Sequence, residues 1–217
     1  MMAGPPGYPV TEGVFSLEVR WILPGPLDLA VAEWFAAFRS EAESREDAYL
    51  LDPDMAGLSV KVRASQALDV KVFGGSPGIL EPGDRVRGRL QHWRKWSFPL
   101  RPPGPGDGDP GGWKRVRKQR LISRFSLRHG QIAVPAEGRG GGPQCAVELT
   151  EIHAQHQDWW TLGLEATGPA GLLRPVLGAT AEVVFARPLP PGADLRLRDS
   201  LSYAEWLRQP LCITPCG

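Results

Sequence analysis

The side chains of this sequence that could do chemistry are cations set at alternate positions along several segments. In 58–63 (LSVKVR), for example, Lys61 and Arg63 alternate with valines. Along the chain, the polar positions of such alternating segments hold ten cations: Arg20, Lys61, Arg63, Lys71, Arg85, Arg87, Arg89, Lys95, Lys118 and Arg120. These positions also hold three carboxylates, Glu18, Glu148 and Glu165. Guanidinium forks and ammonium groups both suit phosphate oxygens, so the pattern predicts a site for a phosphate-rich anion.

This excess of positive charge belongs to one face and not to the whole chain. The sequence has 25 Lys and Arg against 24 Asp and Glu, so its composition gives no hint of a nucleic-acid or membrane partner. A solvated face of a near-neutral protein should carry both signs. Cations crowded into a confined space are costly unless water or an anion neutralises them. Mg²⁺ or Mn²⁺ binds through one or two carboxylates plus substrate phosphates, which gives the three glutamates a second possible role.

The segments that carry these residues alternate with period two, which is typical of β-strands. In the first of them Phe15, Leu17, Val19 and Trp21 share one face. A tight connection over 64–67 predicts a hairpin between 58–63 and 68–72. The expected strands cover 14–21, 47–51, 58–63, 68–72, 84–98, 113–127, 146–150 and 159–167.

Three segments have helical spacing instead. Asp28 is a plausible N-cap for a helix that ends at Phe38. A second helix is expected over 172–186, with Pro175 in its first turn, and a short amphipathic one over 202–207. The mixed-charge stretch 39–46 is interpreted as a solvated connection.

About eight short strands and three helical segments exclude a parallel α/β sheet and point to an antiparallel sandwich or barrel. A half-buried sheet with its charges outside would show the same alternation. The bias in sign favours the opposite arrangement, a closed barrel of about eight strands with a charged interior and helices packed outside. We expect one domain over 13–210, a flexible leader over 1–12 and a tail over 211–217. Pro/Gly-rich loops over 102–112 and 138–143 are expected at the surface.

Other features argue for a cytoplasmic protein. The three cysteines, Cys145, Cys212 and Cys216, include no CxxC pair, so neither a disulfide framework nor a zinc site is expected. No window of about 18 apolar residues and no signal-peptide pattern is present, so no membrane contact is expected. His153 and His156 are interpreted as solvated.

The order of these motifs resembles the CYTH-like, or triphosphate tunnel metalloenzyme, superfamily, whose barrels open with a Glu-x-Glu-x-Lys strand. The matching positions are Ser16-Leu17-Glu18-Val19-Arg20. The resemblance continues through Asp47-Ala48-Tyr49, 58–63, 68–71, Lys118-Gln119-Arg120, 147–149 and 164–165. It implies a tunnel that holds a triphosphate, a divalent metal on glutamates, and hydrolysis or cyclisation at phosphorus.

On that resemblance, Glu18, Lys71 and Arg120 are the candidate catalytic residues, and Glu18, Glu148 and Glu165 are the candidate ligands for Mg²⁺ or Mn²⁺. The candidate substrate-binding residues are Arg20, Lys61, Arg63, Arg85, Arg87, Arg89, Lys95 and Lys118. Two positions depart from the family pattern. Ser16 cannot replace a metal-binding carboxylate and Arg20 cannot act as a proton-accepting amine, so any phosphohydrolase activity is expected to be slow or absent.

Two other functions are compatible with the same residues. One is a barrel that binds an anion without metal and without chemistry, and the convergence of the three glutamates on one point would distinguish it from an enzyme. The other is stacking of single-stranded nucleic acid on Trp93-Arg94-Lys95-Trp96, which is the less favoured partner. The favoured partner is a phosphate-rich small molecule, a nucleotide or polyphosphate. The sequence does not give the oligomeric state.

Overall fold

The computed structural model describes residues 13–52, 54–55, 57–100, 112–128, 131–133 and 142–209. The predicted leader and C-terminal tail lie outside these residues. So does nearly all of the two predicted Pro/Gly-rich loops.

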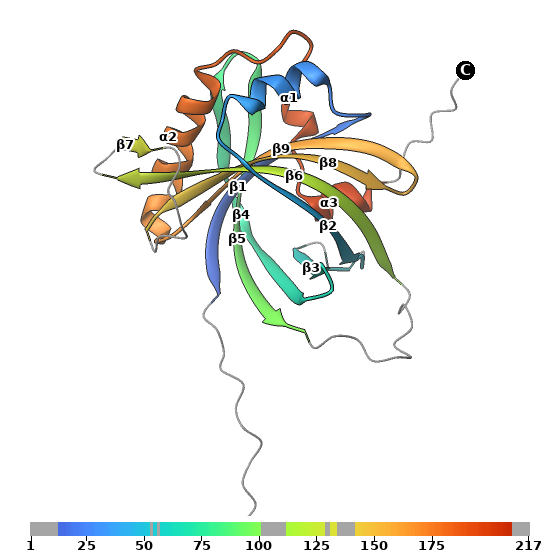
Figure 1. Cartoon of the computed structure of the whole chain (residues 1–217). Coiled ribbons are helices and arrows are strands. Elements are labelled where there is room, and N and C mark those ends of the chain that lie inside the picture. Colours follow the sequence, from blue (N-terminus) through green and yellow to red (C-terminus); the bar gives the residue numbers. More distant parts are fainter. Residues whose placement is uncertain are drawn as a thin grey trace, which may run out of the picture.

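A single antiparallel sheet closes into a barrel of eight strands (Figure 1). Its strands follow the order β2-β3-β4-β5-β1-β9-β8-β6, and a further pairing between β2 and β6 closes the ring, while β7 adds to the free edge of β6. The strands are β1 (Val14–Pro24), β2 (Glu41–Leu50), β3 (Leu58–Arg63), β4 (Ala67–Gly83), β5 (Val86–Pro99), β6 (Trp113–Arg128), β7 (Gln131–Ala133), β8 (Gln144–Ala154) and β9 (Gln157–Thr167). The predicted closed barrel is confirmed, and with it the fold that the family resemblance implied.

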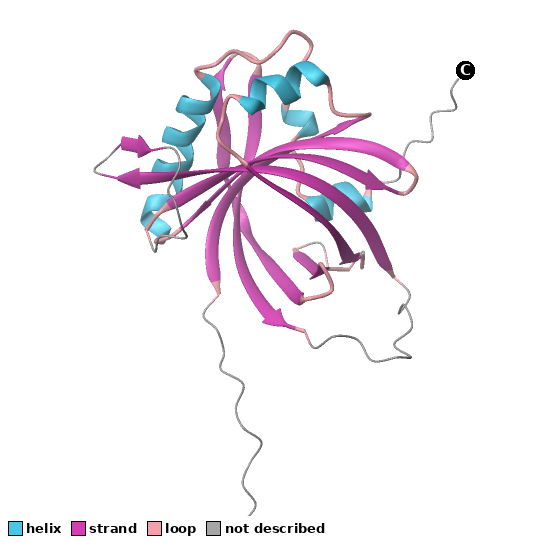
Figure 2. Cartoon of the chain, in the orientation of Figure 1, coloured by secondary structure: helices cyan, strands magenta, loops and turns pink. Residues whose placement is uncertain are grey.

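The apolar face of the barrel wall points outward, against helices. In β1, Leu17, Val19 and Trp21 are buried in the same cluster as residues of α1 (Leu29–Ala36) and α2 (Leu173–Phe185). Both helices lie along the outside of the strands (Figures 1 and 2). Because successive side chains of a strand point to opposite faces, the charged positions of β1 must face the barrel interior. The excess of cations on the polar face of the strands favoured this arrangement.

The helices begin and end close to the predicted positions. Asp28 is the N-cap of α1, and its side chain accepts a hydrogen bond from the Ala30 amide at 2.7 Å. Helix α3 (Tyr203–Arg208) opens with a capping box between Ser202 and Glu205. None of the helices in the described residues is long and apolar enough to cross a membrane.

Helix α3 covers one end of the barrel. Trp206 and Leu207 are buried in a second, smaller core with inward-facing residues of the strands, including Ile22, Tyr49 and Ile152. Gln91 of β5 donates a hydrogen bond to Glu205 at 2.9 Å and ties the helix to the wall. These apolar side chains fill the end of the barrel under α3, and the polar part of the interior lies beyond them.

The interpretation of 39–46 as a solvated connection is wrong, because residues 41–46 form the first part of β2. Its residues pair with β6 in register, for example Glu43 with Arg120. The segment has polar residues on both faces, so no apolar period reveals it. Its outward face lies in solvent, where Glu46 pairs with Arg115 and Arg117. Its inward face carries Glu43 and Arg45 into the barrel.

Candidate functional site: a charged chamber inside the barrel

A chamber of about 310 Å³ occupies the barrel interior next to α3. Every strand of the closed ring contributes to its wall. Eight cations line it: Arg20, Arg45, Lys61, Arg63, Lys71, Lys95, Lys118 and Arg120. Four carboxylates also line it, Glu18, Asp69, Glu148 and Glu165. Asp47 and Glu43 pair with these cations from the same wall.

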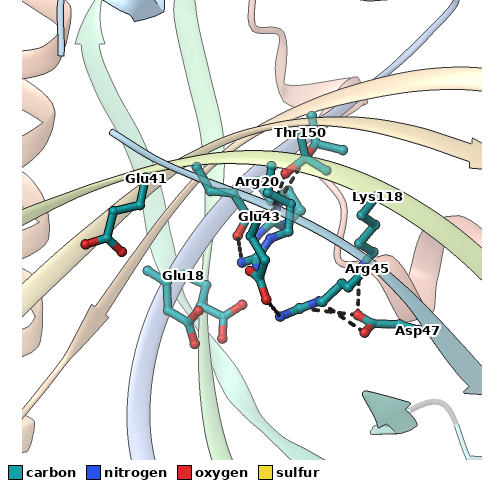
Figure 3. Close-up of polar contacts among 12 residues, drawn as sticks. Glu18, Arg20, Glu41, Glu43, Arg45, Asp47, Lys118 and Thr150 are labelled. Carbon is teal, nitrogen blue, oxygen red and sulfur yellow. Dashed lines mark hydrogen bonds and ion pairs between the residues drawn. The ribbon is translucent and has the colours of Figure 1, made fainter. Parts of the chain in front are cut away.

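Asp47 forms the first of three charge clusters. Its fully buried carboxylate lies 3.0 Å from the Lys61 ammonium, 3.1 Å from the Lys118 ammonium and 3.1 Å from Nε of Arg45. Figure 3 shows Arg45 and Lys118 converging on it from two strands. Burial alone would raise the pKa of Asp47, but the three cations hold it far below its ordinary value. One carboxylate therefore forms ion pairs with three cations.

The two lysines of this cluster lie in an environment that disfavours their charge. Burial lowers the pKa of Lys61 to about 7, and the neighbouring Lys118 contributes to the shift. Burial likewise lowers the pKa of Lys118 to about 8, against the opposing attraction of Asp47. An ammonium group taken out of water is destabilised unless negative charge compensates it. The positive charge here exceeds what Asp47 compensates.

Glu148 is the centre of the second cluster, and its oxygens are fully engaged. It lies 3.3 Å from Arg20, contacts Arg120 and accepts a hydrogen bond from Thr150 at 2.7 Å. Glu43 contacts Arg120 from the other side. Burial would raise the pKa of Glu148, but Arg20 and Arg120 hold it well below its ordinary value. These two arginines and two glutamates neutralise one another.

The position of Arg20 depends on a glycine. Gly163 faces it across the β1–β9 pair, and a Cβ atom at Gly163 would lie 2.8 Å from the Arg20 Cζ atom. The guanidinium therefore lies flat against the backbone of β9. From there it donates a hydrogen bond to Thr161 at 3.0 Å.

The third cluster joins two carboxylates through one lysine. Glu18 and Glu165 are direct neighbours across β1 and β9, and Lys71 reaches from β4 to contact both, 3.2 Å from Glu165. Ser16 donates a hydrogen bond to Glu18 at 2.8 Å. Burial and the charge of Glu165 raise the pKa of Glu18. One ammonium group is therefore shared by two carboxyl groups.

Toward the end of the barrel away from α3, cations again predominate. The buried Asp69 lies 3.0 Å from Arg63 and 3.6 Å from Lys95, and it accepts a hydrogen bond from Ser97 at 2.7 Å. At the α3 end, the Tyr203 ring centroid lies 3.7 Å from the Lys118 ammonium. The same ring lies 4.8 Å from the Arg20 guanidinium. Cation–π contacts of this kind fix the positions of both cations.

Most residues predicted for the site line this chamber. Glu18, Glu148, Glu165 and seven of the ten predicted cations do so: Arg20, Lys61, Arg63, Lys71, Lys95, Lys118 and Arg120. Sequence reasoning missed Arg45, Asp47 as a partner of the cations, Asp69, Tyr49 and Tyr203. The alternation of Glu43, Arg45, Asp47 and Tyr49 was the signal that could have identified the β2 contribution.

The structure does not bring Arg85, Arg87 and Arg89 into the chamber, and the prediction that this row lines it is wrong. Arg85 lies 2.9 Å from Asp194, Arg87 lies 2.6 Å from Glu81, and Arg89 lies 3.6 Å from Glu205. All three side chains are more than 40% exposed. Arg87 and Arg89 have the same phase as Gln91 and Lys95, but they lie on the part of β5 that extends past the chamber, and Arg85 precedes the strand.

The tryptophans proposed for base stacking do not form one surface. Trp93 is buried and lines the chamber. Arg94 points the other way, with its guanidinium 4.9 Å from the Phe15 ring and 5.0 Å from the Trp96 ring. His153, as expected, lies at the surface, where it pairs with Asp158 at 2.8 Å.

The predicted metal ligands are divided between two clusters. Glu18 and Glu165 share Lys71, whereas Glu148 is engaged by Arg20, Arg120 and Thr150. Within the described part of the chain, no three His, Cys, Asp or Glu side chains are grouped so that they could hold a metal ion. The arrangement in this structure therefore does not fit a divalent cation held by the three glutamates.

No protein-family model matches the sequence, and no curated protein matches it. Several solved structures are similar to it, including the following three. A conserved hypothetical protein from Pyrococcus furiosus is 13% identical, with a TM-score of 0.44, over 88% of this chain and 98% of that one. The PH1819 protein from Pyrococcus horikoshii is also 13% identical, with a TM-score of 0.42, over 88% and 97%. The Pct1 RNA triphosphatase of S. pombe is 12% identical, with a TM-score of 0.42, over 83% and 80%.

Proposed function

We propose that the chamber binds a phosphate-rich anion, a triphosphate or a polyphosphate. The observation that carries this proposal is the imbalance around Asp47, where three cations face one buried carboxylate and only Arg45 has a second carboxylate, Glu43, beside it. Because unpaired buried cations are costly, such a cluster is stable only with water or an anion beside it. A phosphate chain supplies several charged oxygens within a few ångströms of one another, which matches a cluster of separate cations.

The charges of the chamber are also segregated. Glu43 contacts both Arg45 and Arg120 and so joins the Asp47 and Glu148 clusters, which together with the Asp69 cluster hold seven cations against four carboxylates. The Lys71 cluster, in contrast, holds one cation against two carboxyl groups. An anion would therefore be attracted to the side formed by β2, β3, β5 and β6, where Arg45, Lys61, Lys95 and Lys118 lie.

Metal-dependent phosphohydrolysis is the finer prediction of the family resemblance for the same chamber, with Glu18, Lys71 and Arg120 as its catalytic candidates. It is tested by phosphate release from tripolyphosphate and nucleoside triphosphates, with and without Mg²⁺ or Mn²⁺. With Ser16 at the first metal position, we expect slow release or none. Rapid release that is lost in Glu18→Gln would instead show an active enzyme.

Binding itself is tested by calorimetry and thermal melts with tripolyphosphate. At a hundredfold excess over Kd, a ligand that binds the native state stabilises it by about 2.7 kcal/mol. The upward shift in Tm should be larger at low ionic strength than at high, because salt screens the attraction. Lys61→Ala should reduce the shift, whereas Arg87→Ala, which removes a cation outside the chamber, should leave it unchanged. An unchanged Tm of the native protein across millimolar tripolyphosphate would contradict the proposal.

A further inference from the structure

Lys71 occupies a place between two carboxylates that would otherwise attract a divalent cation. Glu18 and Glu165 face each other directly across β1 and β9. Two partly buried carboxylates side by side repel, and a cation between them relieves the repulsion. The Lys71 ammonium contacts Glu18 and lies 3.2 Å from Glu165, so the chain itself supplies that cation.

The other donors near this pair do not complete a metal site. Ser16 is buried and donates its hydroxyl hydrogen to Glu18 at 2.8 Å, so it supports the carboxylate. Glu148 is held by Arg20 and Arg120 and belongs to a separate cluster. A metal at Glu18 and Glu165 would therefore displace Lys71 and leave a largely buried ammonium group without its partners. That displacement is unfavourable, because an isolated buried charge is costly.

We infer that Lys71 serves as a built-in cation in the position of a divalent metal, so that the chamber binds its phosphate chain without Mg²⁺ or Mn²⁺. This inference rests on the proposed function, since it concerns the same chamber. The phosphate chain then interacts with the cations Arg45, Lys61 and Lys118. Lys71 offsets the negative charge of Glu18 and Glu165, so these two glutamates do not repel the phosphate chain.

The first test is calorimetric titration of the native protein with tripolyphosphate in EDTA and again in Mg²⁺. The inference predicts binding in EDTA, with an affinity that excess Mg²⁺ does not raise by more than about threefold, or 0.65 kcal/mol. Binding that appears only with Mg²⁺ would support the proposed function and overturn this inference. Absence of binding under both conditions would overturn the proposed function itself.

The second test follows Mn²⁺ directly by electron paramagnetic resonance, without any phosphate ligand. The native protein should leave the spectrum of free Mn²⁺ unchanged. Lys71→Met removes the ammonium group and should create a Mn²⁺ site on Glu18 and Glu165. Lys95→Met, which removes a neighbouring lysine of the chamber that contacts Asp69 instead, is the matched control and should bind no Mn²⁺.

A further variant guards against a failure of Lys71→Met to fold. Lys71→Gln also removes the ammonium group but keeps a polar side chain between Glu18 and Glu165, so it should gain the same Mn²⁺ site. Folding of each variant is checked by circular dichroism. Mn²⁺ binding by the native protein as tight as that of the variants would overturn the inference. So would a folded Lys71→Met variant that gains no Mn²⁺ site.

Discussion

The carboxylate of Asp47 lies 3.1 Å from the ammonium group of Lys118, although 71 residues separate the two positions. Their strands, β2 and β6, form the pair that closes the barrel. Only 2% of the Lys118 side chain and none of the Asp47 side chain is exposed. A charge pair at the closing seam of the barrel is therefore also part of the candidate anion site.

Asp47→Asn should destabilise the protein. It leaves Lys61, Lys118 and Arg45 facing one another without their shared carboxylate, and removing one partner of a buried ion pair typically costs about 3–5 kcal/mol. Urea unfolding of native protein and variant measures the loss. Asp194→Asn, at a surface carboxylate paired with Arg85 and Arg196, is the control and should unfold like the native protein.

The same variant should also respond more strongly to ligand. Tripolyphosphate can take the place of the missing negative charge, so its upward shift in Tm should be larger for Asp47→Asn than for the native protein. A smaller shift would show that Asp47 is needed to position the cations and not merely to neutralise them.

Anion binding should weaken as pH rises from 6 to 9. The pKa of Lys61 is lowered to about 7 and that of Lys118 to about 8, so the free chamber loses positive charge over this range. Above the pKa of one required ammonium, affinity falls roughly tenfold for each pH unit. Calorimetry across the range measures the slope. Lys61→Arg keeps its charge, so it should flatten the profile, which separates the protein's titration from that of the ligand.

The stability of the free protein should change in the opposite direction. Between pH 7 and about 10 the unfolded chain keeps these lysines protonated while the folded chain has released protons. Because the unfolded state binds more protons, the contribution of Lys61 and Lys118 to the free energy of unfolding rises with pH. Urea titrations of native protein and Lys61→Arg over this range test the sign, since the variant should show a smaller rise.

Gly163→Ala should weaken anion binding without unfolding the barrel. The new methyl group would lie 2.8 Å from the Arg20 Cζ atom, so the guanidinium must move away from β9 and from Glu148. Disturbing a buried hydrogen bond to a charged group costs about 1.5–3 kcal/mol. Tripolyphosphate affinity is the measurement. The control is Gly178→Ala in α2, where a methyl group meets nothing within 4 Å.

Tyr203→Leu should lower anion affinity, whereas Tyr203→Phe should preserve it. The aromatic ring lies against Lys118 and Arg20, and it is the ring face that attracts their charges. Leucine keeps an apolar contact in α3 but has no such face. Equal affinities for the two variants would show that the ring only fills space at the closed end of the chamber.

The sequence by itself determined which face of each strand is charged. Alternation along a strand is a local consequence of backbone geometry, so the common phase of Glu18, Arg20, Lys61 and Lys71 could be predicted without knowing the fold. The bias toward cations on that phase then indicated a closed interior. All four of these side chains line the chamber.

Only the tertiary structure decided which charges meet. Arg87 has the same phase as Lys95 on β5, yet it lies beyond the chamber, because phase does not tell how far along a strand the lumen extends. Asp47 lies in a segment with no apolar face, so only its pairing with β6 makes it a strand residue of the wall. The separation of Glu148 from Glu18 and Glu165 likewise depends on arginines from other strands. Charge pairing acts over a few ångströms between segments far apart in the chain, and those distances are fixed only when the barrel closes.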